Sequence, residues 1–598
     1  MSRSGPTAIE IPETVSSGAC ARLFPFGYFY ELKCLLKLAV PITLTSLVNY
    51  LFGPISVVFC GRLGHFELAT VGLAISVFNV TGLSVAMGLL TACDTLFAQI
   101  YGSNDLSKMG LNLQRSIILM LLCCLPCWSL HLMMEPLLLL LRQNPKISKE
   151  AATYLVYMIP CLAFASVGQI FTKYVQAQNH VFPPLIIGLI SNLLNALMHY
   201  ILLFVAGIGI KGSAFAQCIA YACQTLGFIL YTKWHKMSVY TWCNYSSKLW
   251  HEWGLWFRLA VPGLFMVTLE WTIFEIGSLV AGVLGERELA AQTIIYNIES
   301  MCYTLLPLGV GLAASIRVGH FLGAQSAVGP KSVTSVSVIT ICLSSVPLII
   351  LFIFARWKIP YLFTSDSRVV ELAANLLPIL AVFQIFDSIV GTCSGVIRGA
   401  GLQYIGAIIC IVTLYVIGAP VGICLIFLAK IGLQGLWWGL CLGVFISSII
   451  YLIVCFRLNW EKQVASAMAR IRTVRFSSRT NYSRPEDLDS GEQSTEQRNV
   501  NSLAVVPKNL FGRRKEEQNS SSPPSRKRLL CSRILLVAVL TSHFIISLIL
   551  YCQLRWKDYF GVYCLYDNGT FIQFNDLQEL NKFRDTSPLY SNCTTVIP

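Results

Sequence analysis

The segment LAVP at residues 38–41 recurs as LAVP at residues 259–262, displaced by 221 positions. The same displacement relates the pairs Leu63 and Leu284, Gly64 and Gly285, Glu67 and Glu288, Gly88 and Gly309, and Gly102 and Gly323. Chance is a poor explanation for an ungapped register of this length, so the chain contains an internal duplication.

Both copies consist mainly of apolar runs of about 20 residues, and a helix of that length spans roughly 30 Å of hydrocarbon. Hydrophobic residues make up 55% of the 598 positions and charged residues 12%, with a mean hydropathy of +0.64. Soluble proteins carry about 25% charged residues, so water is excluded as the main solvent. The predicted spans are 38–60, 68–92, 116–141, 152–172, 183–206, 211–232, 259–282, 289–315, 333–355, 370–394, 404–428, 432–456 and 531–553.

The predicted fold class is an all-α polytopic membrane protein with two six-helix lobes and a detached thirteenth helix. Six spans separate corresponding elements, so both lobes enter the membrane in the same orientation, as in alternating-access transporters built from parallel repeats. The predicted divisions are an N-terminus 1–35, an N-lobe 36–235, a linker 236–258, a C-lobe 259–456, a basic linker 457–529, a thirteenth helix 530–554 and a tail 555–598.

The net charge of +14 arises mostly from clusters between residues 457 and 533, such as residues 513–515 and 526–528. Such clusters are typical of cytoplasmic segments beside a membrane, and they favour anionic lipid over nucleic acid as the partner. We therefore expect residues 458–529 and the N-terminus to be cytoplasmic and residues 557–598 to be extracellular.

Carboxyl groups inside spans cost about 2.5–3.5 kcal/mol on insertion scales and indicate a cavity, a partner or a proton path. Four candidates are Glu270, Glu275, Glu299 and Asp387, whereas Asp94 is interpreted as a cap or loop charge. Glu270 and Glu275 lie about 140° apart around their helix, so they line different sides of a cavity. The span interiors offer almost no basic partner. Candidate aromatic faces for an organic cation are Trp271, Phe274, Tyr296 and Tyr303.

At these residues the chain resembles the multidrug and toxin extrusion (MATE) family, most closely its vertebrate members, over about residues 35–465. The resemblance rests on VFCG at 58–61, NVTG at 79–82, ACDT at 92–95, Glu270-Trp271 with Glu275, and GVIRG at 395–399. It implies a twelve-helix, V-shaped antiporter that exports organic cations in exchange for protons. The substrate-associated acids of the family fall on Glu270, Glu275 and Asp387, and a polar first-lobe residue falls on Asn79.

Three departures from the family pattern concern the site. After Tyr296, where vertebrate members generally have Glu, this chain has Asn297, and Glu299 follows two positions later. Two positions turn a side chain by about 200°, so we expect Glu299 to be a poor replacement. Asp387 is one methylene shorter than the vertebrate Glu. The span-one aspartate of many prokaryotic members has no equivalent, which favours coupling in the second lobe.

The resemblance also implies a thirteenth span and an extracellular C-terminal tail. That tail contains the glycosylation sequons at Asn568 and Asn592, and Cys564 and Cys593 are candidate disulfide partners. We expect a multi-pass plasma-membrane glycoprotein that functions as a monomer.

The expected mechanism is competition between a proton and an organic cation for the same carboxylates, with H⁺ as the coupling ion and no other cofactor. No Walker loop and no metal-ligand spacing is present in the sequence. The alternatives are a lipid-linked oligosaccharide flippase, which would need cations for a pyrophosphate, and a cation uniporter or channel. A membrane-bound enzyme is disfavoured, since the spans contain no His-Asp or Ser-His-Asp constellation.

Overall fold

The computed structural model describes residues 27–235, 237, 247–472, 526–554, 556–566, 571–586 and 593–596. Both predicted glycosylation sites, Asn568 and Asn592, lie outside these residues. The described chain is almost entirely helical.

The described residues contain twelve helices that are long and apolar enough to span a membrane, and a thirteenth span if one bent pair of helices is counted as a single span. In the N-lobe they are α2 (Tyr28–Tyr50) with α3 (Phe52–Gly61); α4 (His65–Phe78), η1 (Asn79–Leu83), α5 (Ser84–Leu89) and α6 (Thr91–Gly102); α7 (Leu106–Leu132); α9 (Pro145–Tyr157) with α10 (Ile159–Ala177); α11 (Phe182–Tyr200) with η2 (Ile201–Val205); and α12 (Ile210–Trp234). A short helix α8 (Met134–Leu140) precedes α9. The pair α9 and α10 bends by 50°.

The C-lobe repeats this order. Its spans are α14 (Trp253–Leu284); α15 (Glu286–Leu305) with α16 (Pro307–Gly323); α17 (Gly329–Phe354); α18 (Ser367–Ala400); α19 (Gln403–Cys410), η5 (Ile411–Gly418) and α20 (Ala419–Phe427); and α21 (Leu433–Arg457). Short 3₁₀ turns, η3 (Ser247–Trp250) and η4 (Pro360–Leu362), lie in the connections. The predicted duplication is thus confirmed helix by helix.

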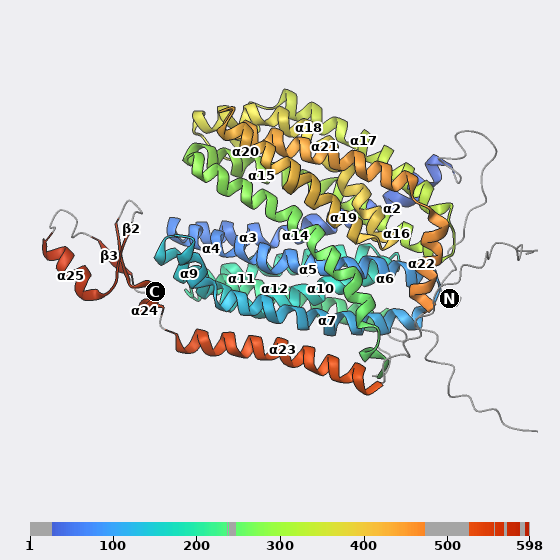
Figure 1. Cartoon of the computed structure of the whole chain (residues 1–598), viewed down its shortest axis with the longest axis horizontal. Helices are drawn as coiled ribbons and strands as arrows, with labels where there is room; N and C mark the ends of the chain where they lie inside the picture. The colour runs from blue at the N-terminus through green and yellow to red at the C-terminus, as the bar shows by residue number, and fades with distance from the viewer. Residues whose placement is uncertain are drawn as a thin grey trace, which may run out of the picture.

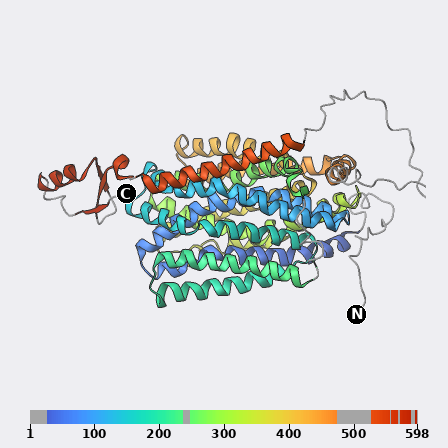
Figure 2. The ribbon, with the colours of Figure 1, turned by 90° about the horizontal axis from the view of Figure 1, so that it is seen from below.

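The two lobes lie side by side, with the start of α2 and the C-terminal strands at opposite ends of the bundle (Figures 1 and 2). We call the end that holds the start of α2, the helix α22 (Trp460–Arg472) and the start of α23 (Arg526–Gln553) the linker face. The opposite end, which holds α8 and the C-terminal residues, is the tail face. The thirteenth helix, α23, packs along α7 of the N-lobe.

Contacts between the lobes occur in pairs whose residues are related by the 221-residue displacement. A Cβ atom on Gly102 would lie 2.2 Å from the carbonyl oxygen of His320, and one on Gly323 would lie 2.8 Å from the Cα atom of Gly102. Gly102 and Gly323 are repeat-related, so the pseudo-twofold axis passes between them. Only glycine permits this approach of two backbones. A side chain at either position would separate the lobes.

A second pair of repeat-related contacts follows the same rule. A Cβ on Gly88 would lie 2.6 Å from the Cα of Leu264, and one on Gly309 would lie 3.2 Å from the Cα of Thr43. Because the displacement converts one contact into the other, the symmetry predicted from sequence extends to the packing between the lobes.

Side-chain bonds also join the lobes near the linker face. Arg317 of α16 donates from Nε and Nη2 to the two carboxylate oxygens of Glu31 in α2, at 2.9 and 2.7 Å. Glu31 is fully buried. His320 Nε2 lies 2.8 Å from the carbonyl oxygen of Ala177 in α10. These contacts close the linker face of the interface between the lobes.

The C-terminal residues form a small module at the tail face, which the all-α prediction did not anticipate. Strands β1 (Val562–Leu565), β2 (Phe571–Phe574) and β3 (Thr594–Val596) form an antiparallel sheet in the order β2-β1-β3, beside the helices α24 (Lys557–Phe560) and α25 (Leu577–Thr586). Cys564 and Cys593 form a disulfide, as expected. Alternate residues of β1 face opposite sides, and on one side Tyr563 packs against Leu139 of the N-lobe.

Several helices begin earlier than the sequence predicts. The first starts at Tyr28, within the predicted N-terminus, and α14 starts at Trp253, within the predicted inter-lobe linker. The thirteenth starts at Arg526 instead of residue 530. Hydropathy detects only the part of a helix that lies in hydrocarbon, whereas these helices extend beyond it with polar residues.

Candidate functional site

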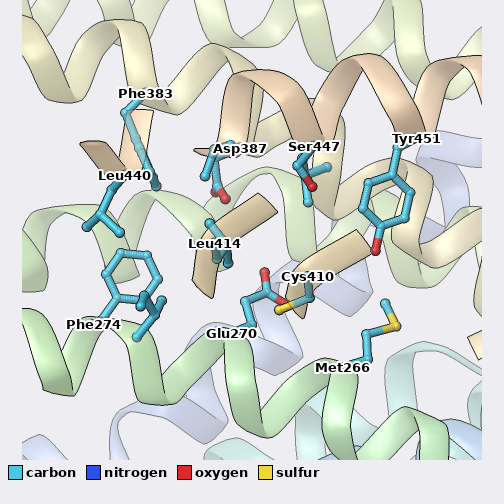
Figure 3. A pocket seen from close by; sticks show the side chains of 13 residues that line it. Met266, Glu270, Phe274, Phe383, Asp387, Cys410, Leu414, Leu440, Ser447 and Tyr451 are labelled. Atoms are coloured by element: carbon cyan, nitrogen blue, oxygen red, sulfur yellow. The ribbon is translucent and has the colours of Figure 1, made fainter. Parts of the chain in front are cut away.

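A pocket in the interior of the C-lobe contains two of the predicted acids. Glu270 projects from α14 and Asp387 from α18, and their carboxyl groups point into the same space from opposite sides (Figure 3). The other lining residues are Met266, Ile273, Phe274, Phe383, Val390, Cys410, Leu414, Leu440, Val444, Ser447 and Tyr451. Two acids therefore face a mostly apolar cavity enclosed by α14, α18, α19, η5 and α21.

Asp387 lies on the buried face of α18, where only 5% of the residue is exposed. Its neighbours on this helix include the buried polar residues Gln384, Ser388 and Thr392, which interrupt an otherwise apolar span. The Oδ2 atom of Asp387 is buried and has no hydrogen-bond partner. A buried acceptor without a donor is costly, so this oxygen is suited to receive a proton or a cation.

Glu299 of α15 joins the same cluster, and its ability to replace the family's Glu in function stays a prediction. Only 4% of the residue is exposed, and its carboxyl group interacts electrostatically with those of Asp387 and Glu270. Asn297 is instead exposed, and its Nδ2 donates to the carbonyl oxygen of Thr293 at 2.7 Å. The rotation of about 200° is correct, but it turns Glu299 toward the interior of the lobe.

Four aromatic side chains form a cluster at the end of the pocket nearer the tail face. Phe274 stacks on Tyr296 at 5.5 Å between ring centroids and meets Phe383 edge-on at 6.2 Å. Phe383 in turn meets Trp437 edge-on at 5.6 Å. Phe274 and Phe383 lie at one end of the pocket, and Met266 and Tyr451 lie at the other (Figure 3). The aromatic cluster therefore separates the acids from the tail-face side.

The remaining predicted site residues do not line this pocket. Glu275 is partly exposed and interacts electrostatically with Tyr296, and Trp271 is 36% exposed. Tyr303 interacts electrostatically with Glu270 and Asp387 from α15. Asn79 begins the π-helical turn η1 in the N-lobe. The structure thus brings Glu270, Asp387 and Glu299 together and leaves Asn79 in the other lobe.

The volume of the pocket limits what it can hold in this conformation. The space available to the centre of a water-sized sphere is about 20 Å³. A single water needs roughly 10–15 Å³ by this measure, whereas drug-sized ligands occupy cavities of about 300–1,000 Å³. The acid pocket therefore accommodates a water molecule, and a drug-sized ligand would require either a rearrangement or a position outside the pocket.

Basic residues are closer to the buried acids than the sequence indicates. Lys173 Nζ lies 2.5 Å from Oδ1 of Asp94, and both side chains are at most 10% exposed. Asp94 is thus a buried ion-pair partner within a span, and its interpretation as a cap or loop charge is wrong. Arg398 is 8% exposed and interacts electrostatically with Glu270. Periodicity alone gives no sign of these pairings, because they join different helices.

The N-lobe has an uncharged counterpart of the acid pocket. Asn49 stands at the position equivalent to Glu270, and Gln224 at the position equivalent to Ser447, where the displacement has drifted by two. Gln224 Nε2 donates to Oδ1 of Asn49 at 2.8 Å. The N-lobe thus has two hydrogen-bonded amides at the positions where the C-lobe has the carboxyl group of Glu270 and the hydroxyl group of Ser447. The chemistry of the two lobes therefore differs although their folds are equivalent.

Among the residues that the structure describes, no group of three His, Cys, Asp or Glu side chains is arranged to hold a metal ion. The candidates for charge exchange are the three clustered carboxyl groups and Glu275. A two-lobed bundle of repeated helices, with a cluster of carboxyl groups in the interior of the C-lobe, defines the chain as a membrane transporter with a duplicated fold.

Comparison with known proteins identifies the transporter family to which the chain belongs. The MatE family model matches residues 41–201 and 262–424, and the two matches begin 221 positions apart. Multidrug and toxin extrusion protein 2 of Mus musculus is 40% identical over 442 residues, which cover 74% of this chain and 77% of that protein. Multidrug and toxin extrusion protein 1 of Homo sapiens is 38% identical over 81% of this chain and 84% of that protein. The chain belongs to the MATE family.

Solved structures agree. The eukaryotic MATE transporter AtDTX14 has a TM-score of 0.71 and 28% identity, covering 74% of this chain and 99% of that one. The Vibrio cholerae MATE transporter VcmN in its bent form has a TM-score of 0.63 at 18% identity and supports the fold alone. The matched relatives are transporters, and the resemblance found in the sequence is confirmed.

Proposed function

We propose that this transporter exports organic cations in exchange for protons by alternating access between its two lobes. The observation that carries the proposal is the cluster of Glu270, Asp387 and Glu299 in the C-lobe interior. Three carboxyl groups in a low-dielectric interior cannot all remain charged without counter-charges. Arg398 supplies one positive charge nearby, so the rest is supplied by a mobile proton or cation.

In this proposal the proton and the organic cation bind at different carboxyl groups of the C-lobe. The water-sized pocket around Glu270 and Asp387 suits protons, whereas partly exposed Glu275, with the aromatic faces of Trp271 and Tyr296, suits an organic cation. Protonation of Glu270 and Asp387 lowers the total negative charge of the C-lobe interior that attracts a cation, and loss of the protons restores that charge. The two ligands therefore compete through charge, and this competition couples their movements.

In this proposal the linker face is cytoplasmic and the tail face extracellular, at the plasma membrane. The Lys and Arg clusters that precede α23 support this orientation. The disulfide between Cys564 and Cys593 also supports it, because disulfides persist in oxidising compartments. The closed linker face then corresponds to an outward-facing state, in which the acids take up protons and release the cation. The inward-facing state would reverse both steps.

The proposal needs no cofactor besides H⁺ and no second subunit. A lipid-linked oligosaccharide flippase is disfavoured, because acids outnumber cations around the pocket and a pyrophosphate would be repelled. A cation uniporter or channel is the second candidate, and its transport would respond to voltage.

Uptake of a labelled monovalent organic cation into proteoliposomes under an imposed pH gradient tests the function. We expect uptake to rise when the vesicle interior is more acidic than the medium, and to cease when the gradient is collapsed with a protonophore. Uptake that ignores the pH gradient and follows a potassium–valinomycin voltage would refute antiport in favour of the uniporter.

A further inference from the structure

Helix α22 (Trp460–Arg472) lies across the linker face, where the sequence predicts only a basic linker. It follows α21 and runs transverse to the spans, from the C-lobe toward the N-lobe (Figure 1). Thirteen residues of helix extend about 20 Å, enough to cross the boundary between the lobes. Its apolar residues Trp460, Val464, Ala467 and Ile471 follow helical spacing, and the first three pack into the core formed with α2 and α16.

The last turn of α22 caps a helix of the C-lobe. Arg470 Nη2 donates to the carbonyl oxygen of Ala400 at 3.0 Å, and Nε donates to that of Ser466 at 3.2 Å. Ala400 ends α18, whose last carbonyl groups lack partners within the helix and attract positive charge. Burial lowers the pKa of Arg470 to about 10, so its guanidinium stays protonated at cytoplasmic pH.

The same end of α18 binds the N-lobe directly. Thr95 Oγ1 of α6 donates to the carbonyl oxygen of Arg398 at 2.6 Å, and Gln99 Nε2 donates to that of Gly399 at 2.9 Å. Three successive carbonyl groups of α18 therefore accept hydrogen bonds, two from the opposite lobe and one from α22. The helix that carries Asp387 therefore ends at the contact between the two lobes on the linker face.

Helix α22 also contacts the N-lobe. Lys108 Nζ of α7 donates to the carbonyl oxygen of Ile471 at 3.2 Å, and α22 touches α6. Arg470 and Ile471 share a small cavity with N-lobe residues that include Gln99, Lys108 and Asn112. The last turn of α22 is thus fixed to both lobes at the point where they meet.

We propose that α22 is a latch: its last turn holds the linker face closed and leaves the N-lobe whenever the lobes separate there. The surface on α6 and α7 is then the docking site for a segment of this same chain, Arg470 and Ile471. The inference rests on the proposed alternating access, but it concerns an equilibrium between two states and needs no proton or cation to be observed.

Hydrogen exchange provides the first test, because α22 lies outside the spans and its amides are protected by docking. Glu31→Gln, which breaks the inter-lobe pair with Arg317, opens the linker face at a site remote in sequence from α22. We expect it to accelerate exchange in the last turn of α22 by about a hundredfold. Glu371→Gln is the matched control, because its pair with Arg287 is exposed. Unchanged exchange in α22, when the linker face opens, would refute the latch.

The reciprocal test removes the latch contacts. Lys108→Met should increase the population with an open linker face about tenfold, because the hydrogen bond from Lys108 Nζ to Ile471 joins the N-lobe to α22 and exists only in the closed state. Arg470→Gln loosens the last turn of α22 from the end of α18 and should shift the population in the same direction. Lys462→Gln removes the same charge from the exposed side of α22 and should have no effect. The population is read as a distance between spin labels at Ser107 and Val328, at one fixed pH.

If Lys108→Met and Lys462→Gln both leave the spin-label distance unchanged, α22 is a passive surface helix and the proposal fails. This outcome differs from failure of the proposed function, because the spin-label distance reports the lobes in the absence of any gradient. If the protein transports without proton coupling, the proposed function fails, but the distances between the labels at Ser107 and Val328 still test the latch.

Discussion

The inter-lobe pair of Glu31 and Arg317 gives the most direct measure of how firmly the linker face is closed. Both contacts of the bidentate pair are short, and the side chains are 0% and 14% exposed. Glu31→Gln leaves the guanidinium buried without a counter-charge in the closed state, whereas in the open state water solvates it. Breaking a buried pair in this way costs about 3–5 kcal/mol.

The lower figure corresponds to about a hundredfold change in the ratio of open to closed molecules. A population of 1:99 would become roughly 1:1, which is within the range of a distance measurement. Exposed repeat-related positions on opposite lobes, Ser107 and Val328, are suitable for spin labels. The labels must be attached to non-natural amino acids, because the described residues include 18 free cysteines.

We expect Glu31→Gln to produce a second, longer distance between these labels in lipid nanodiscs. The exposed pair of Arg287 and Glu371, at 4.0 Å, provides the matched control, and Glu371→Gln should leave the distances unchanged. The charge-swapped variant, with Glu31→Arg and Arg317→Glu together, should restore much of the short distance. A single short distance in Glu31→Gln would show that this pair does not hold the lobes together.

The other predictions concern the acids, energetics and topology. Glu275→Gln and Asp387→Asn should abolish proton-coupled uptake at normal surface abundance, whereas the exposed control Glu286→Gln should not; normal pH-dependent uptake by both would exclude them as coupling sites. Glu299→Gln should now impair uptake as much as Asp387→Asn, and a fully active variant would contradict its place in the cluster. Exchange of one proton for one monovalent cation moves no net charge across the membrane. A difference of one pH unit, which is worth about 1.4 kcal/mol, should therefore drive uptake. A voltage of 100 mV, which would contribute about 2.3 kcal/mol on an uncompensated charge, should not drive it. Replacing the tail asparagines at 568 and 592 should remove glycosidase-sensitive mobility in cells if the tail is extracellular.

The sequence alone determined the number of spans, the duplication and the presence of acids in the second half. Each depends on a signal that is local in the chain or constant in displacement. Hydrocarbon thickness sets the length of a span wherever it occurs, and the offset of the LAVP segments holds whatever the fold. The family resemblance placed the acids at Glu270, Glu275 and Asp387, but neither it nor periodicity could say which of them meet.

The tertiary structure decided the partners. The sequence does not place Glu299 near Glu270 and Asp387, because a helical wheel gives the angle between two side chains but not the direction of the lobe interior. Asp94 and Lys173 form an ion pair across two helices that are 79 positions apart in the sequence, and no periodicity relates them. Helix α22 was missed because a net basic composition concealed its apolar stripe.

The difference between the two lobes shows what the sequence determines and what only the tertiary structure determines. The sequence determines that Asn49 occupies the position equivalent to Glu270, since the displacement is constant. Only the fold shows that Gln224 satisfies Asn49 while Glu270 faces Asp387 across a cavity. Side-chain chemistry is encoded residue by residue, but the free energy of a buried charge depends on groups brought near it by other helices, and their arrangement exists only in the folded chain.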